Sequence, residues 1–141
     1  MKIAQLGTDS VLMAPITAAT TARTSSNLDC TGANYATIRV VVGAEVNTNA
    51  TNIPLSFKES DDTNASNFAT FSSTTQRTLD NTAGAVATTH LDLRSRKRYL
   101  NVTVTPDTTT NGAVLTSVQA TVYKNVISDS ATMLGADVVI L

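Results

Sequence analysis

Apolar residues recur at every second position in several short segments of this chain, and this alternation restricts what it can fold into. In Tyr35–Val42 the alternating apolar residues are Ala36, Ile38, Val40 and Val42, and in Tyr99–Thr105 they are Leu100, Val102 and Val104. Period two places such residues on one face of a pleated strand, whereas an amphipathic helix repeats them every three to four residues. Helical spacing is nearly absent, so we predict an all-β fold.

Clusters of Gly, Asn, Asp and Pro separate the other candidate strands. These are Val11–Ala18, Ile53–Glu59, Asn67–Ser72, Val86–Leu93 and Val114–Tyr123, with a weaker extended segment at Thr20–Leu28. Pro15 lacks the amide proton that a ladder needs, which predicts an edge position for the first strand. Seven to nine short strands at this spacing favour one antiparallel two-sheet β-sandwich or jelly roll over residues 1–141, with little helix.

The composition determines what such a sandwich can use as a core. Hydrophobic residues make up 42% of the 141 residues, but aromatic residues only 4%, and Trp is absent, so aliphatic side chains must do most of the packing. The alternation predicts a core that contains Ile38, Val40, Leu55, Phe57, Leu100, Val102, Val104 and Val118. Outside it we expect an extended N-terminal arm at residues 1–10 and a C-terminal tail at residues 128–141.

The charge content limits the partners. Charged residues make up 15% and the formal net charge is −1, so we expect no binding to nucleic acid or to a membrane. No apolar run approaches the roughly 20 residues of a spanning helix, and Met1–Ser10 lacks the apolar run of a signal peptide. Cys30 is the single cysteine, which excludes an internal disulfide.

Few residues offer catalytic or metal-binding chemistry. His90 is the only histidine and no G-x-S-x-G motif accompanies it, so we interpret it as structural. Glu59, Asp61 and Asp62 are suitable ligands for Ca²⁺, but they lack the D-x-D-x-D-G order of a dedicated loop, which favours a solvated turn. We therefore predict no enzyme, no cofactor, no catalytic residue and no metal site. Whether the acidic turn binds a cation stays open.

Two segments are candidates for contact with another protein. The first is the densest basic run, at a predicted turn between strands, formed by Arg94, Arg96, Lys97 and Arg98. Arginine suits bidentate pairing with the carboxylates of a partner, although a solvated turn is the alternative. Strict alternation would put Arg94 and Arg96 furthest out and Arg98 at the rim of the core.

The second candidate is the apolar end of the sequence, formed by Val138, Val139, Ile140 and Leu141. Chain termini are seldom this apolar unless they are docked. The segment would either complete the chain's own sheet or add a strand to a neighbouring subunit.

Two segments resemble small structural proteins of tailed phages. Leu55–Asp62 followed by Ser66–Phe68 resembles their "L-x-E-S-D-D … S-x-F" hairpin, and Leu91–Val102 resembles their "D-L-R-x-R-K-R-Y-L-x-V" segment. Tyr35–Val40 fits their early strand, and together the segments cover about half of the chain in the expected order. The usual Gly between the arginines is Ser95 here.

The proteins that share these segments are similar to head decoration, or cement, proteins, which are jelly-roll-like and often trimeric on the capsid exterior. The resemblance implies a structural virion protein, made in the host cytoplasm, that binds the outside of a phage capsid as a homotrimer and cements neighbouring major capsid proteins. It implies no catalytic residue. A tail or head-fibre component is the alternative. In a different class, a carbohydrate-binding β-sandwich is disfavoured by the sparse aromatics.

Overall fold

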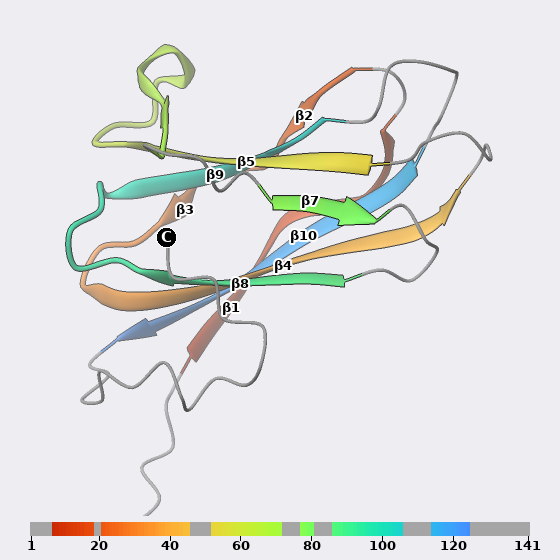
Figure 1. Ribbon diagram of the computed structural model, residues 1–141. Coiled ribbons are helices and arrows are strands. Elements are labelled where there is room, and N and C mark those ends of the chain that lie inside the picture. Colours follow the sequence, from red (N-terminus) through yellow and green to blue (C-terminus); the bar gives the residue numbers. More distant parts are fainter. Residues whose placement is uncertain are drawn as a thin grey trace, which may run out of the picture.

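Two antiparallel sheets packed face to face form the described part of the chain (Figure 1). The structure, a computed structural model, describes residues 7–18, 21–45, 52–71, 77–80, 86–105 and 114–124. Sheet A has the order β1 (Gly7–Ala18), β10 (Val114–Lys124), β4 (Ala33–Glu45) and β8 (Val86–Asp92). All pairings within it are antiparallel.

Sheet B is built on two central strands, β9 (Tyr99–Val104) and β5 (Asn52–Ser60). The short strands β2 (Arg23–Thr24) and β3 (Leu28–Asp29) both pair with β9. On the other side, β6 (Ala69–Thr70) and β7 (Arg77–Asp80) both pair with β5. Among these described ranges the only helix is a single 3-10 turn, η1 (Ala65–Asn67).

The strand order is that of a jelly roll. We count β2 with β3, and β6 with β7, as one interrupted edge strand each, which leaves eight strands in the described residues. The first strand then pairs with the eighth, the second with the seventh, the third with the sixth and the fourth with the fifth. One long antiparallel hairpin rolled into two layers has this pairing. The predicted all-β sandwich is confirmed, and its strand number lies in the predicted range.

The alternation in the sequence becomes the two faces of the strands. All eight predicted core residues are at most 3% exposed, namely Ile38, Val40, Leu55, Phe57, Leu100, Val102, Val104 and Val118. Neighbouring positions on the same strands face outward, as Arg39 does on β4 and Gln119 on β10. Burial of these apolar side chains between the sheets is the main force that holds the sandwich together.

The bounds of the edge strands differ from those predicted from the sequence. β1 is an edge strand as Pro15 predicts, and its register with β10 shifts between Val11 and Met13 and between Met13 and Ile16. It begins at Gly7, inside the range predicted as an arm. β7 lies in a stretch where no strand was predicted. The predicted strand at Asn67–Ser72 shortens to β6, because η1 occupies the preceding residues. The tail at residues 128–141 lies outside the described residues.

Candidate interaction surface

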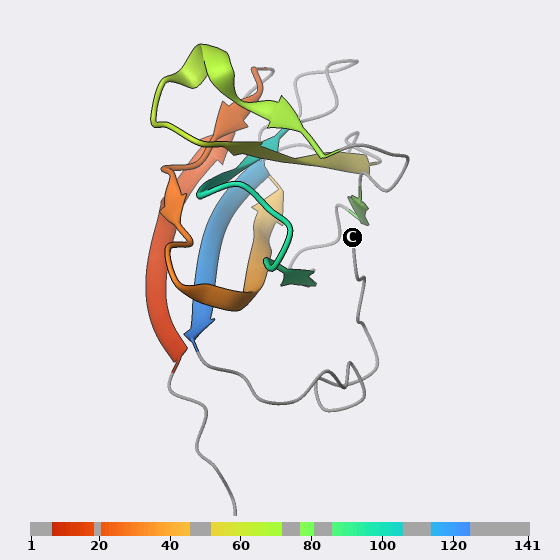
Figure 2. The ribbon, with the colours of Figure 1, turned by 90° about the vertical axis from the view of Figure 1, so that its left-hand side faces the viewer.

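The basic run lies in the loop that carries the chain from β8 in sheet A to β9 in sheet B, at the end of the sandwich that faces the viewer in Figure 2. The N–H of Arg96 donates to the carbonyl of Leu93 (3.1 Å), which closes a turn with Arg94 and Ser95 at its centre. The N–H of Leu93 donates to the carbonyl of Asn34 (2.8 Å). Backbone hydrogen bonds therefore fix the start of this loop.

Arg94 is held by the last residue of β8. Asp92 Oδ1 accepts the backbone N–H of Arg94 (3.0 Å), and the guanidinium binds both carboxylate oxygens, with Nη2 2.5 Å from Oδ2. The guanidinium carbon also lies 5.5 Å from the ring centroid of Tyr35. The hydrogen bonds from Arg94 lower the pKa of Asp92. About half of the Arg94 side chain is exposed, so the pair is oriented yet accessible.

Arg98 is held in the same way by β3. Its Nε and Nη2 donate to the two oxygens of Asp29, at 3.2 and 2.8 Å, and its guanidinium carbon lies 4.8 Å from the ring centroid of Tyr99. Asp29 also accepts the N–H (3.0 Å) and the hydroxyl (2.6 Å) of Thr31. These bonds, with that from Arg98 foremost, hold the pKa of Asp29 well below its usual range. The Arg98 side chain is also half-exposed.

Arg96 points inward, which corrects the expectation that it lies furthest out. Its Nη1 lies 3.8 Å from Oε1 of Glu59, both side chains are only 18% exposed, and its guanidinium carbon lies 4.3 Å from the ring centroid of Phe71. Under strict alternation Arg98 would lie at the rim of the core, whereas its side chain is half-exposed and binds Asp29. Strict alternation fails because the turn at Leu93–Arg96 interrupts the strand.

Lys97 completes a set of four ion pairs. Its Nζ lies 3.3 Å from Asp61, and its backbone N–H donates to Glu59 Oε2 (3.3 Å). We call the set the ion-pair ladder; it consists of Asp92–Arg94, Glu59–Arg96, Asp61–Lys97 and Asp29–Arg98. Asp62 lies beside it. Among the described residues, each of the four cations of the run is paired with a carboxylate, so the ladder itself carries no net charge.

The acidic turn is occupied by donors of this chain. Asp62 accepts the N–H of Asn64 (2.9 Å) and the side-chain amide of Asn67 (2.7 Å), and the bond from Asn67 is the main cause of its lowered pKa. Glu59 and Asp61 belong to the ion-pair ladder. Within the described residues, no group of three or more His, Cys, Asp and Glu side chains is placed to hold a metal ion. This turn therefore supports the loops at this end of the molecule.

His90 and Cys30 have structural surroundings. His90 Nδ1 lies 2.9 Å from the hydroxyl of Thr37 on the neighbouring strand, and partial burial lowers its pKa. Cys30 is buried, its thiol donates to the carbonyl of Leu28 (3.7 Å), and burial raises its pKa to about 12. The buried Cys30 thiol lacks the exposure and activation that a nucleophile needs.

Sequence reasoning found the four cations of this surface but not their partners. The carboxylates come from β3, β5 and β8 and from Asp61, which follows β5, and only the fold brings them together.

The apolar segment Val138, Val139, Ile140 and Leu141 lies outside the described residues. In the part of the chain that is described, no helix has the length and apolar character to span a membrane. Comparison with protein-family models, with curated proteins and with solved structures gives no significant match.

Proposed function

We propose that this chain is a structural virion protein that binds the outside of a phage capsid and cements neighbouring major capsid proteins. The proposal rests on the resemblance of Leu91–Val102 and Leu55–Phe68 to head decoration proteins. A jelly roll is a fold that viral structural proteins use, which agrees with it by analogy. The protein would be made in the host cytoplasm and act on the capsid exterior, without enzymatic activity or cofactor.

The structural observation that supports a contact surface is the fixed presentation of Arg94 and Arg98. Each side chain is half-exposed, and its guanidinium is bound by a carboxylate of the same chain and lies beside an aromatic ring. Their side-chain entropy is therefore largely lost before a partner binds, which reduces the cost of association. Because each cation of the run is paired with a carboxylate of the same chain, recognition would depend on the geometry of these groups rather than on attraction by a basic patch.

The test is occupancy on particles. We suggest heads assembled from the major capsid protein that is encoded in the same genome, mixed with the purified chain and separated by sedimentation. Changing Arg94 and Arg98 together to Ala should reduce occupancy, because desolvated pairs at an interface cost about 2–5 kcal/mol when one side is removed. Arg23→Ala is the matched control, since Arg23 is exposed and pairs with Val104 at the opposite end of β9. Equal occupancy for both folded variants would contradict the anchoring role.

The oligomeric state is a separate part of the proposal. We expect a homotrimer, as the resemblance implies, and sedimentation showing only monomer at tens of micromolar would count against a trimer in solution. Deleting residues 137–141 removes Val138, Val139, Ile140 and Leu141. Loss of stability in the monomer would indicate that they complete the chain's own sheet. Loss of association alone would indicate a strand donated to a neighbour.

A tail or head-fibre component is the competing structural role. Electron microscopy of virions with an antibody against this chain separates the two, because label over the head supports decoration and label confined to the tail or to fibres contradicts it.

A further inference from the structure

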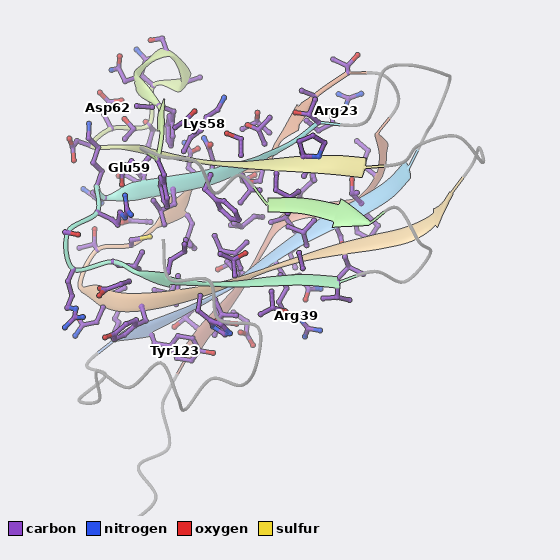
Figure 3. All side chains as sticks on the ribbon, in the orientation of Figure 1. Arg23, Arg39, Lys58, Glu59, Asp62 and Tyr123 are labelled. Atoms are coloured by element: carbon purple, nitrogen blue, oxygen red, sulfur yellow. The ribbon has the colours of Figure 1, made fainter. Side chains whose placement is uncertain are left out.

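The outer face of sheet A, turned away from sheet B, carries two tyrosines in one row. Tyr123 on β10 is in register with Tyr35 on β4, with Gly7 and Asp92 in register beyond them on β1 and β8. Residues directly opposite each other on paired strands share a face, so the four form a line across the sheet. Both tyrosines are partly exposed, and Figure 3 shows Tyr123 on this face.

Gly7 determines how Tyr123 lies. A Cβ atom at position 7 would lie 3.0 Å from Cε1 and 3.3 Å from Cδ1 of the Tyr123 ring, and 2.5 Å from the methyl group of Thr121. A side chain there would displace the Thr121 methyl group and press on the ring. The ring of Tyr123 therefore lies against β1 in the space that glycine leaves.

A row of hydrogen-bonding groups lies beside the tyrosines. It consists, in register across the sheet, of Asp9, Thr121, Thr37 and His90. Thr121 donates to Asp9 (2.6 Å), and the Thr37 hydroxyl lies 2.9 Å from His90 Nδ1. These bonds fix the side chains, and a carboxylate has further acceptor capacity after one bond. An aromatic surface flanked by a few oriented polar groups is typical of small-ligand sites.

The charges balance among the side chains that the structure describes on this face. Asp9 and Asp92 are negative, and Arg39, near the centre of the face, and Arg94, which lies over Tyr35, are positive. A strongly charged ligand therefore gains no net attraction, whereas a neutral, hydroxyl-rich ligand can use both the ring and the hydrogen-bonding groups. From β1 to β8 the row spans three strand spacings, about 14 Å, which is long enough for a short oligosaccharide.

We propose that the outer face of sheet A binds a neutral oligosaccharide, with a sugar ring stacked on Tyr123 and its hydroxyls bound by Asp9. The chain has few aromatic residues, but the fold places two of its three tyrosines in this row. This function is additional to capsid binding and independent of it. On a decorated particle it would hold the virion at a surface coated with glycans.

The test uses the purified full chain on a microarray of neutral glycans, followed by calorimetric titration of the strongest binder. Tyr123→Ala should weaken binding about tenfold or more, since it removes the stacking surface. Gly7→Ala should weaken it as well, because the added methyl group displaces the Thr121 side chain, which binds Asp9, and presses on the ring, while Tyr123→Phe should retain most of it. Gln119→Ala is the control on the same strand and face, with unchanged affinity expected. Circular dichroism and thermal melting confirm that each variant is folded.

Absence of binding to every glycan on the array would overturn the proposal, as would a folded Tyr123→Ala variant with the affinity of the wild type. If Tyr123→Ala lowers occupancy on heads while the wild type binds no glycan, this face contacts the capsid instead. That result would overturn glycan binding and leave the virion role standing. Glycan binding by a chain that does not bind heads would support the glycan site and contradict the capsid role.

Discussion

Arg96, in the loop between β8 and β9, lies against Glu59 near the end of β5, and both side chains are only 18% exposed. The Arg96 guanidinium carbon lies 4.3 Å from the ring centroid of the buried Phe71, and Nη1 lies 3.8 Å from the Glu59 carboxylate. Glu59 also accepts the backbone N–H of Lys97. Among the four ion pairs of the ladder this one is the least exposed, so its electrostatic energy is the least screened by water.

Arg96→Ala should therefore destabilise the fold. The change removes the stacking over Phe71 and leaves the partly buried Glu59 without its cation, so we expect the free energy of unfolding to fall by about 1–3 kcal/mol. Arg94→Ala removes a half-exposed pair and should cost about 0–1 kcal/mol. Urea denaturation followed by circular dichroism measures both, and equal costs would contradict an inward role for Arg96.

Acid should lower the stability of the fold through the two half-exposed ion pairs of the ladder, Asp29–Arg98 and Asp92–Arg94. The pKa values of Asp29 and Asp92 are lowered in the folded state, chiefly by hydrogen bonds from Arg98 and Arg94. Their contribution is complete above the ordinary aspartate pKa of about 4 and is lost as the pH falls below it. The urea midpoint of the wild type should drop from pH 5 to pH 3. An Asp29→Asn, Asp92→Asn double variant should show a smaller drop over the same range, and a parallel drop would count against this source of pH dependence.

His90 should make stability depend on pH in a higher range. Burial lowers its folded-state pKa, so the unfolded chain binds the proton more readily. Stability should consequently be complete above the ordinary histidine pKa of about 6.5 and decrease as the pH falls through it. Thermal melts of the wild type and of His90→Gln at pH 7.5 and 5.5 test this. The expected result is a smaller difference between the two pH values in the variant.

Cys30 should not react in the native state. Its thiol is buried and has a pKa raised to about 12, so the nucleophilic thiolate is scarce at pH 8. Ellman's reagent should label the protein only at the rate at which it unfolds, and the rate should rise with urea concentration. Rapid, stoichiometric labelling without denaturant would show that the thiol is accessible.

A charge in the core should abolish folding. Val102 is fully buried at the centre of sheet B, and an unpaired buried carboxylate costs several kcal/mol against a total stability of roughly 5–15 kcal/mol. Val102→Asp should therefore give an unfolded or aggregated product. Val11→Asp is the control, because Val11 is 66% exposed on β1 and should tolerate the change. Soluble expression and circular dichroism distinguish the two outcomes.

The core could be predicted from the sequence because alternation is local. The polar and apolar residues next to Val40 in the sequence indicate which face of the strand it lies on, and residues on the inner face of a sandwich are buried. β7 was missed because its residues lie in a Ser- and Thr-rich stretch with little alternation. The pairing of β1 with β10 was beyond prediction for another reason, since nothing local to either strand specifies a partner so distant in the sequence.

The ladder shows the same limit. Arg98 is conspicuous in the sequence, but its partner Asp29 becomes a neighbour only when β3 pairs with β9. One local signal was available. Asp29, Asp62 and Asp92 each accept the N–H of the residue two positions later, which is the preferred turn geometry of aspartate. This pattern identifies the three turns that hold the loops at this end, and it explains why the basic run turns instead of continuing as a strand.

The pairing of β1 with β10 also determines when the fold can be completed. Asp9 and Thr121, which are bonded to each other, are 112 residues apart in the chain. During synthesis, β1 therefore leaves the ribosome long before β10, the strand with which it pairs. Its backbone N–H and C=O groups are available to other chains in the meantime. Pro15 and the two register shifts in β1 make it a poor template for such pairing. The irregularity of β1 would then protect nascent chains from aggregation until β10 arrives.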